Sequence, residues 1–275
     1  MTASRAQRSW VSDLSDSSLR AVLFDIGGTL LEYVPEVSAA GRRLLEEGCR
    51  RAYDWLREQG KELPEYGEFA RRHWRALWWG RLRRRMRGRE LRAQRVVLEV
   101  LARMGVEVRP EEIYELTACY HRPFAETLRP MPGAREVLAE LSRRGLKLAT
   151  VSNTAWPGYL LEEDLARFGL TEHLEFSLYS SYFGRPKPAE GIFLQALKML
   201  GVDSEEALFV GDSPKEDIWG AHRVGMRTVL VASDGPDNPR RVAYRRVAPD
   251  WVISQLAELL PIVERLVETE EEAGD

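Results

Sequence analysis

Short apolar segments recur along the chain, and each is rich in β-branched residues or is followed directly by a turn. Such segments predict buried strands, because a strand that is covered on both faces has no polar side. The predicted strands are residues 21–25, 146–152, 174–179, 207–212, 228–232 and 251–253. Helical patterns with proline near the start and glycine after the end separate the later strands. This alternation predicts an α/β protein with a doubly wound parallel sheet, a Rossmann-like core.

Residues 34–128 differ from the rest, because they contain no convincing strand and repeat apolar residues at helical spacing. The four stripes are Leu45, Cys49, Ala52 and Leu56; Trp74, Trp78, Leu82 and Met86; Val97, Val100, Leu101 and Met104; and Ile113, Leu116, Thr117 and Tyr120. One stripe per helix predicts four amphipathic helices that bury their apolar faces together. We therefore expect a four-helix-bundle cap at 34–128, inserted into an α/β core of residues 19–33 and 129–267. The Ser-rich residues 1–18 predict a disordered lead-in, and residues 268–275 predict an acidic tail.

Composition narrows the class of protein. The 275 residues are 44% hydrophobic and carry a net charge of −3, which is typical of a globular protein and gives no general attraction to nucleic acid. No apolar run is long enough to span a bilayer, and the first residues lack the apolar centre of a signal peptide. The two cysteines, Cys49 and Cys119, share no metal-ligand spacing, so we expect buried thiols in a reducing, cytoplasmic setting.

Polar residues stand at the ends of the predicted strands. Asp25 ends the first, Ser152 and Asn153 end the second, and Asp212 ends the fourth. Lys187, one of only five lysines, lies between two prolines just before a helix. Open parallel sheets bind ligands beyond the carboxyl ends of their strands, so these side chains are expected to converge. Carboxylates hold Mg²⁺, and a lysine and a hydroxyl orient phosphoryl oxygens, so the set predicts magnesium-dependent chemistry on a small phosphorylated metabolite.

These blocks, in this order and with helices placed after the first, resemble the haloacid dehalogenase-like superfamily, in its subfamily I arrangement. The resemblance extends over about residues 19–267 and implies a hydrolase that forms an aspartyl-phosphate on Asp25. It implies that Lys187 pairs with both phosphate and nucleophile and that the Gly27 carbonyl is a metal ligand. The implied site is Asp25, Ser152 and Lys187 for catalysis; Gly28, Thr29 and Asn153 for substrate binding; and Asp25, Gly27, Asp212 and Asp217 for metal binding.

Gly27 departs from the pattern, because phosphatases of this superfamily usually carry an acid–base aspartate at that place. Loss of such a group costs on the order of 10²–10⁴-fold in rate. We therefore expect a phosphatase that is slow or that favours good leaving groups, with Glu32 or Tyr33 as possible substitutes for the acid. The alternatives are haloacid dehalogenase or phosphonate hydrolase chemistry, or a catalytically weak binding or regulatory protein. The retained Asp212 and Asp217 favour metal and phosphate, and Lys61 is the lone cap lysine for phosphonate chemistry.

Arginines crowd residues 81–89, beside three tryptophans. Such a run fits a surface for nucleic acid or another polyanion. It also fits a solvated helix face whose arginines pair with glutamates, and we favour this interpretation. A third possibility is that one or two arginines lean over the active site and select an anionic substrate. The four histidines, His73, His121, His173 and His222, show no ligand spacing, so we expect surface or packing roles.

Overall fold

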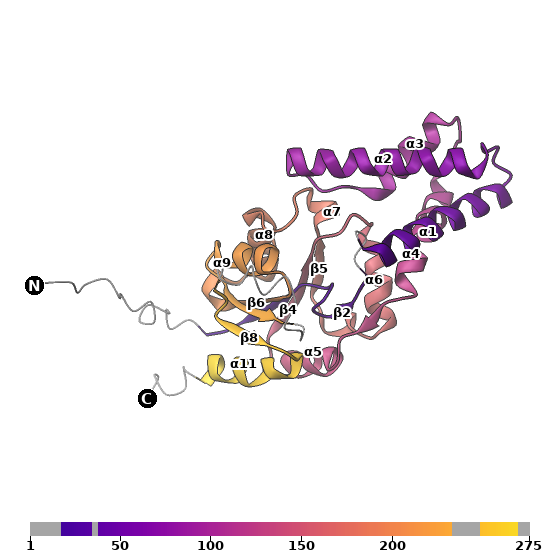
Figure 1. Ribbon diagram of the computed structural model, residues 1–275. Coiled ribbons are helices and arrows are strands. Elements are labelled where there is room, and N and C mark those ends of the chain that lie inside the picture. The colour runs from indigo at the N-terminus through magenta and orange to yellow at the C-terminus, as the bar shows by residue number, and fades with distance from the viewer. Residues whose placement is uncertain (1–17, 35–37, 233–247, 269–275) are drawn as a thin grey trace, which may run out of the picture.

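The computed structural model describes residues 18–34, 38–232 and 248–268. A six-stranded sheet forms its core, with strand order β5-β4-β1-β6-β7-β8 (Figure 1). The strands are β1 (Ala21–Phe24), β4 (Lys147–Ser152), β5 (Phe176–Tyr179), β6 (Ala207–Gly211), β7 (Arg227–Val231) and β8 (Trp251–Ile253). Every neighbouring pair is parallel, and the chain winds outward from β1 in both directions. The predicted doubly wound parallel sheet is therefore confirmed.

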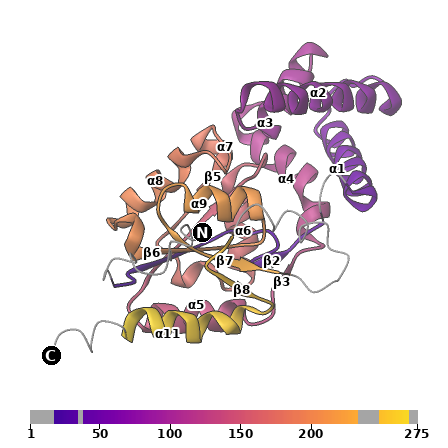
Figure 2. The same ribbon diagram turned by 60° about the vertical axis from the view of Figure 1, so that its left-hand side comes forward.

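Helices cover both faces of this sheet (Figures 1 and 2). They are α5 (Ala134–Arg143), α6 (Gly158–Arg167), α7 (Ser180–Phe183), α8 (Glu190–Leu200), α9 (Gly220–His222) and α11 (Leu259–Glu268), with 3₁₀ turns η2 (Thr171–His173), η3 (Ser204–Glu206) and η6 (Leu256–Glu258). Val22 and Phe24 of β1 lie in one apolar cluster with α5 and α11, whereas Ala21 and Leu23 lie in another with α8. This division follows from the two-residue period of a strand.

Four helices and one short turn form the cap: α1 (Ala39–Glu58), α2 (Tyr66–Arg87), α3 (Ala93–Arg103), η1 (Pro110–Glu112) and α4 (Ile113–Ala125). Their buried side chains share one apolar cluster. The Ser38 side chain begins α1 by accepting a hydrogen bond from the Gly41 amide at 2.9 Å, which satisfies a free N–H of the first turn. Two short antiparallel strands, β2 (Leu31–Glu32) and β3 (Arg129–Pro130), pair where the chain enters and leaves the cap.

The predicted stripe on α2 is partly wrong. Trp78 and Met86 are 58% and 76% exposed, so they do not belong to the core of the cap. α2 is buried through Phe69 and His73, and Gly80 still packs against Leu91, so Trp78 lies off the covered face, whereas Met86 lies near the end of the helix beyond it. A helical period predicts which residues share a face, but not how far along the helix a partner covers that face.

Other expectations have mixed outcomes. Cys49 and Cys119 are buried free thiols, as expected. The predicted lead-in and acidic tail lie outside the described residues, apart from residues 18 and 268. In the described parts of the chain, every helix is too short or too polar to cross a bilayer.

Candidate active site

Three carboxylates meet at the carboxyl edge of the sheet. Asp25 directly follows β1 and Asp212 directly follows β6, its hydrogen-bonded neighbour. Asp217 lies in η4 (Pro214–Trp219), a π-helical turn that comes next in the chain. One carboxylate oxygen from each residue lies within 4.8 Å of the others. Adjacent parallel strands end at the same edge, so the topology brings together the acidic residues that the sequence singled out.

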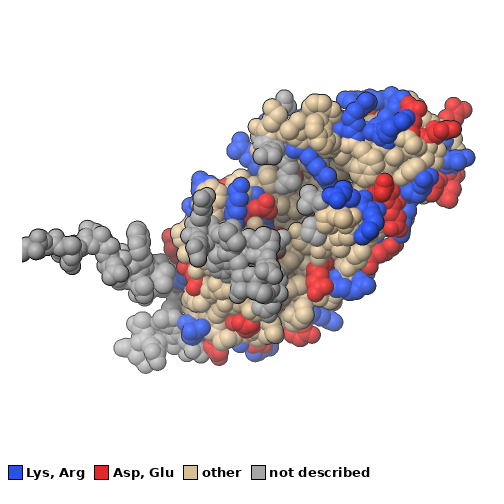
Figure 3. Space-filling model, in the orientation of Figure 1, with Lys and Arg blue, Asp and Glu red and all other residues tan. Residues whose placement is uncertain are grey.

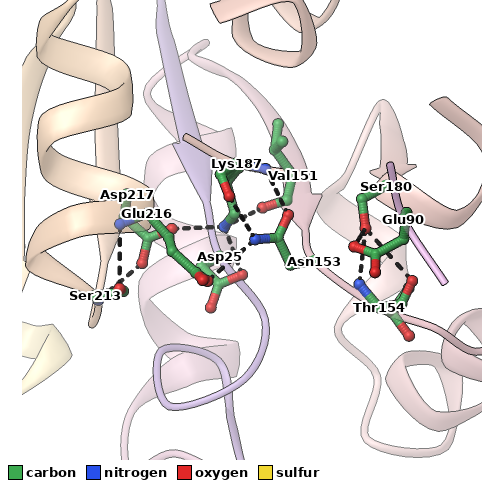
Figure 4. A network of polar contacts seen from close by, with 10 residues as sticks. All are labelled: Asp25, Glu90, Val151, Asn153, Thr154, Ser180, Lys187, Ser213, Glu216 and Asp217. Atoms are coloured by element: carbon green, nitrogen blue, oxygen red, sulfur yellow. Dashed lines mark hydrogen bonds and ion pairs between the residues drawn. The ribbon is translucent and has the colours of Figure 1, made fainter. Parts of the chain in front are cut away.

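Lys187 binds two of these carboxylates. Its Nζ lies 2.8 Å from Asp25 Oδ1 and 2.6 Å from Asp217 Oδ1, and it donates to the Val151 carbonyl at 2.7 Å (Figure 4). Burial by itself lowers the pKa of the Lys187 ammonium, but the charges of Asp217 and Asp25 outweigh it and raise that pKa above its ordinary value. Burial also raises the pKa of the Asp217 carboxyl, against the opposing charge of Lys187. Lys187 therefore remains a cation at neutral pH.

Two glycines allow the carboxylates to come this close. A Cβ at Gly211 would lie 2.5 Å from the Asp217 side chain, too close for any residue with a side chain. Gly28 has a φ of +81°, and a Cβ there would collide with the Asp212 carboxylate. The Ser213 amide donates to Asp217 Oδ2 at 2.8 Å, which holds the loop after β6 in place. Gly28 is thus required for both contact and conformation, and Gly211 is required for contact.

Asn153 fastens the Lys187 segment to the end of β4. Its Oδ1 accepts from the Lys187 amide at 2.7 Å, and its Nδ2 donates to the Lys187 carbonyl at 3.0 Å (Figure 4). The same Nδ2 donates to Glu216 Oε2 at 3.0 Å. The side chain of Asn153 is therefore occupied in positioning Lys187, which is how the lysine reaches Asp25.

A cavity of about 440 Å³ opens beyond these strand ends, between the sheet and the cap. Its lining includes Asp25, Gly27, Ser152, Asn153, Asp212 and Asp217 from the core, Tyr33 from the chain after β2, and His121, Phe124 and Thr127 from the cap. The volume lies in the range of small-molecule sites. Six of the expected site residues thus face one cavity. Gly28, Thr29 and Lys187 do not line it, and Thr29 is fully buried, so a substrate in this cavity has no direct contact with Thr29.

Several lining residues carry no signal that sequence reasoning used. His121 of α4 and Asp164 of α6 form a buried pair, with Nε2 and Oδ2 2.6 Å apart, and the Trp156 ring lies 5.4 Å from the imidazole. The pair joins the cap to the core across one wall of the cavity. His121 directly follows the predicted stripe of α4, so its place beside an apolar face was the one available hint.

Other expected contributors lie elsewhere. Lys61 Nζ binds Glu112 at 2.9 Å and the Glu107 carbonyl at 2.8 Å, and it does not line the cavity. Among the described side chains, no arginine between residues 81 and 89 lines it either. The structure therefore gives no support to a substrate-selecting role for those arginines in this cavity.

Comparisons with known proteins agree with this geometry. A family model for haloacid dehalogenase-like hydrolases matches residues 19–225. The chain is 30% identical over 256 residues to ribulose-1,5-bisphosphate 5-phosphatase of Halopiger xanaduensis, covering 88% of this chain and 98% of that one. It is 33% identical over 261 residues to phosphoserine phosphatase of Thermus thermophilus, covering 90% and 95%.

The solved structures agree on the fold. A 2-haloacid dehalogenase from Pseudomonas syringae superposes with a TM-score of 0.61 at 23% identity, covering 90% of this chain and 99% of that one. At this identity the likeness concerns the fold. The family match over residues 19–225, together with the curated relatives, shows that the chain belongs to the haloacid dehalogenase-like hydrolase family, and the protein is a hydrolase of that family.

Proposed function

We propose that the protein is a Mg²⁺-dependent phosphatase, which hydrolyses phosphomonoesters of small metabolites through an aspartyl-phosphate on Asp25. The observation that carries this proposal is the cluster of Asp25, Asp212 and Asp217 with Lys187 bound between two of them. Two relatives are named as phosphatases of small phosphorylated molecules, which supports the substrate class.

The charge of the cluster fits a divalent cation. When all three carboxyl groups are ionised, they and the Lys187 ammonium leave two negative charges in a largely buried place, which favours a bound cation of charge two. Oxygen ligands at short mutual distance suit Mg²⁺. Asp25, Asp212 and Asp217 would hold the ion, together with the Gly27 carbonyl. When bound, it would polarise the phosphoryl oxygens and neutralise their charge.

The protein side chains have distinct roles in the proposed reaction. The Asp25 carboxylate attacks phosphorus and the P–O bond to the leaving group breaks, so that the leaving oxygen departs as an anion and takes a proton from water. A second water then hydrolyses the aspartyl-phosphate, which releases inorganic phosphate and restores Asp25. The Lys187 ammonium neutralises charge beside the nucleophile, and Asn153 keeps the lysine in place. The Ser152 hydroxyl, which lines the cavity, donates to a phosphoryl oxygen. The cap, which we place at 34–128, excludes water from the attacking carboxylate.

Gly27 offers no proton to the leaving oxygen. Alcohols with high pKa values need such a proton, whereas phenols and carboxylic acids leave as stable anions. The proposed enzyme therefore hydrolyses aryl and acyl phosphates faster than alkyl phosphates. Dehalogenation is less favoured, because it has no use for the carboxylates of Asp212 and Asp217. Phosphonate hydrolysis is less favoured because Lys61 is held in an ion pair outside the cavity.

The test is phosphate release from p-nitrophenyl phosphate, acetyl phosphate and glycerol phosphate, with Mg²⁺ and with EDTA. We expect release with Mg²⁺, fastest from the first two esters, and loss of it in Asp25→Asn. The matched control is Asp54→Asn, because Asp54 is an exposed aspartate on α1. No release from any ester at high enzyme concentration would contradict the proposal. Halide release from 2-haloacids in EDTA would favour the dehalogenase alternative instead.

A further inference from the structure

A second hollow, of about 570 Å³, lies between the cap and the core and shares no lining residue with the active-site cavity. Five arginines line it: Arg83, Arg89, Arg92 and Arg95 from the cap, and Arg185 from the core. We call it the arginine pocket. Figure 3 shows basic side chains gathered along the boundary between cap and core on the face that it displays. The pocket therefore combines a small-molecule volume with a strong positive charge.

The two carboxylates of the arginine pocket are already engaged. Glu99 binds Arg95 at 2.9 Å. Glu90 accepts hydrogen bonds from the Ser180 hydroxyl at 2.6 Å and from the Leu91 amide at 2.9 Å. In residues 18–34, 38–232 and 248–268, the other four arginines of the pocket have no carboxylate partner. Like charges around one hollow repel one another unless an anion enters.

We propose that the arginine pocket binds a small molecule that carries two or more phosphate groups. A guanidinium binds a phosphate through two parallel hydrogen bonds, and four guanidinium groups without a carboxylate partner exceed what a single phosphate can use, although Arg92 also donates to the Tyr182 carbonyl at 3.4 Å. The walls come from α2, α3, the loop that joins them, and the end of α7 with the loop after it, so the pocket suits a compact ligand rather than an extended strand. Among the described residues that line it, Phe183 is the one aromatic side chain, which offers little stacking for a series of bases.

The arginine pocket is linked to the active site through the chain itself. Arg185 lies two residues before Lys187, and the Gly184 carbonyl accepts from the Glu90 amide at 3.0 Å. The Glu90 carboxylate accepts a hydrogen bond from the Ser180 hydroxyl, which in turn accepts one from the Thr154 amide at 3.0 Å (Figure 4). Thr154 in turn lines the active-site cavity. A ligand that joins Arg89 and Arg92 of the cap to Arg185 of the core would therefore hold the cap against the core.

The test uses inorganic tripolyphosphate as the probe, with calorimetric titration of the full-length protein in EDTA at physiological salt. The pocket variant is Arg89→Gln, Arg92→Gln and Arg185→Gln combined. The control variant is Arg57→Gln, Arg71→Gln and Arg103→Gln, which removes three exposed cap arginines outside the pocket and changes the net charge equally. We expect one site per chain, affinity at least about tenfold weaker in the pocket variant, and little change in the control.

Other outcomes would overturn the proposal. One is no binding of tripolyphosphate by the wild-type protein, and another is an equal loss in both triple variants, which would mean attraction by net charge alone. Orthophosphate that binds as tightly as tripolyphosphate would contradict the requirement for several phosphates. Single-stranded DNA that binds more tightly, with the same dependence on the pocket arginines, would assign the pocket to nucleic acid. If the triple variant melts early, Arg185→Gln alone and the tripolyphosphate-induced rise in melting temperature provide the same comparison.

Discussion

The ring of Tyr33 covers the point where a side chain of residue 27 would begin. A Cβ on Gly27 would lie 3.1 Å from Cδ1 and 3.2 Å from Cε1 of Tyr33. The turn after β1 returns the chain to this place, because the Gly28 amide donates to the Leu31 carbonyl at 2.7 Å. The side chain of an acid–base residue at position 27 and the ring of Tyr33 would therefore compete for the same space at the active-site cavity.

Restoring an aspartate should consequently require the ring to move. We expect Gly27→Asp alone to raise turnover of glycerol phosphate by less than about tenfold, because the new side chain meets Tyr33. Combined with Tyr33→Ala, it should approach the ~10²–10⁴-fold gain of a positioned acid. Steady-state kinetics on alkyl and aryl phosphates measure this, with Tyr33→Ala alone as the control. A full gain from Gly27→Asp alone would show that the ring is no obstacle.

Lys187 stabilises the fold as well as the nucleophile. Lys187→Met leaves Asp25 and Asp217 without their buried cation, so we expect a loss of roughly 3–5 kcal/mol in the free energy of unfolding in EDTA. Mg²⁺ should restore more stability to this variant than to the wild type, because a bound cation replaces part of the lost charge. Urea unfolding with and without Mg²⁺ measures both effects. The control is Lys198→Met on the exposed face of α8, and equal stability of the two variants in EDTA would contradict the prediction.

The pair of His121 and Asp164 should hold the cap over the substrate. Asp164→Asn keeps the shape but removes the charge that faces His121 Nε2 at 2.6 Å. We expect a loss of about 1–3 kcal/mol in the free energy of unfolding, because a buried polar group loses its charged partner. KM should rise more than kcat falls, since neither residue contacts Asp25. Thermal melting and steady-state kinetics test this, and kinetic constants equal to those of Asp54→Asn would rule out the role.

His73 should make the cap sensitive to acid. Burial lowers the pKa of the His73 imidazole from 6.5 to about 4, although its hydrogen bond to the Phe69 carbonyl opposes the shift. Between pH 6.5 and about pH 4, the His73 imidazole binds a proton in the unfolded chain but not in the folded protein. Stability therefore falls as the pH drops through this window, by about 3 kcal/mol in all.

Replacing His73 should remove this part of the pH dependence. We expect His73→Leu to lose less stability than the wild type between about pH 7 and about pH 4.5. Urea unfolding at both pH values gives the loss of stability of each protein. Subtracting one loss from the other removes the contribution of the carboxylates, which titrate in both proteins. His222→Asn, which changes an exposed histidine, is the control and should behave like the wild type. Parallel pH profiles for wild type and His73→Leu would contradict the assigned shift.

The strands and most of the candidate site could be predicted from the sequence. Buried parallel strands are continuous apolar runs, and their carboxyl ends share one edge, so Asp25 and Asp212 had to lie near each other once the sheet was recognised. Predicted strand ends were correct to within about two residues, the usual precision of such boundaries. The glycines that admit Asp212 and Asp217 were visible as motif residues, but the contacts that require them were not.

The sequence by itself thus determined the parallel sheet, the helical cap and the cluster of acidic residues with Lys187, because these follow from local periods and from strand order. The tertiary structure alone decided the ring of Tyr33 over Gly27, the pair of His121 and Asp164, and the exposed end of α2. Each of these depends on how the cap and the chain after β2 pack against the core. Contacts between distant segments are fixed by packing and leave no periodic trace in the sequence.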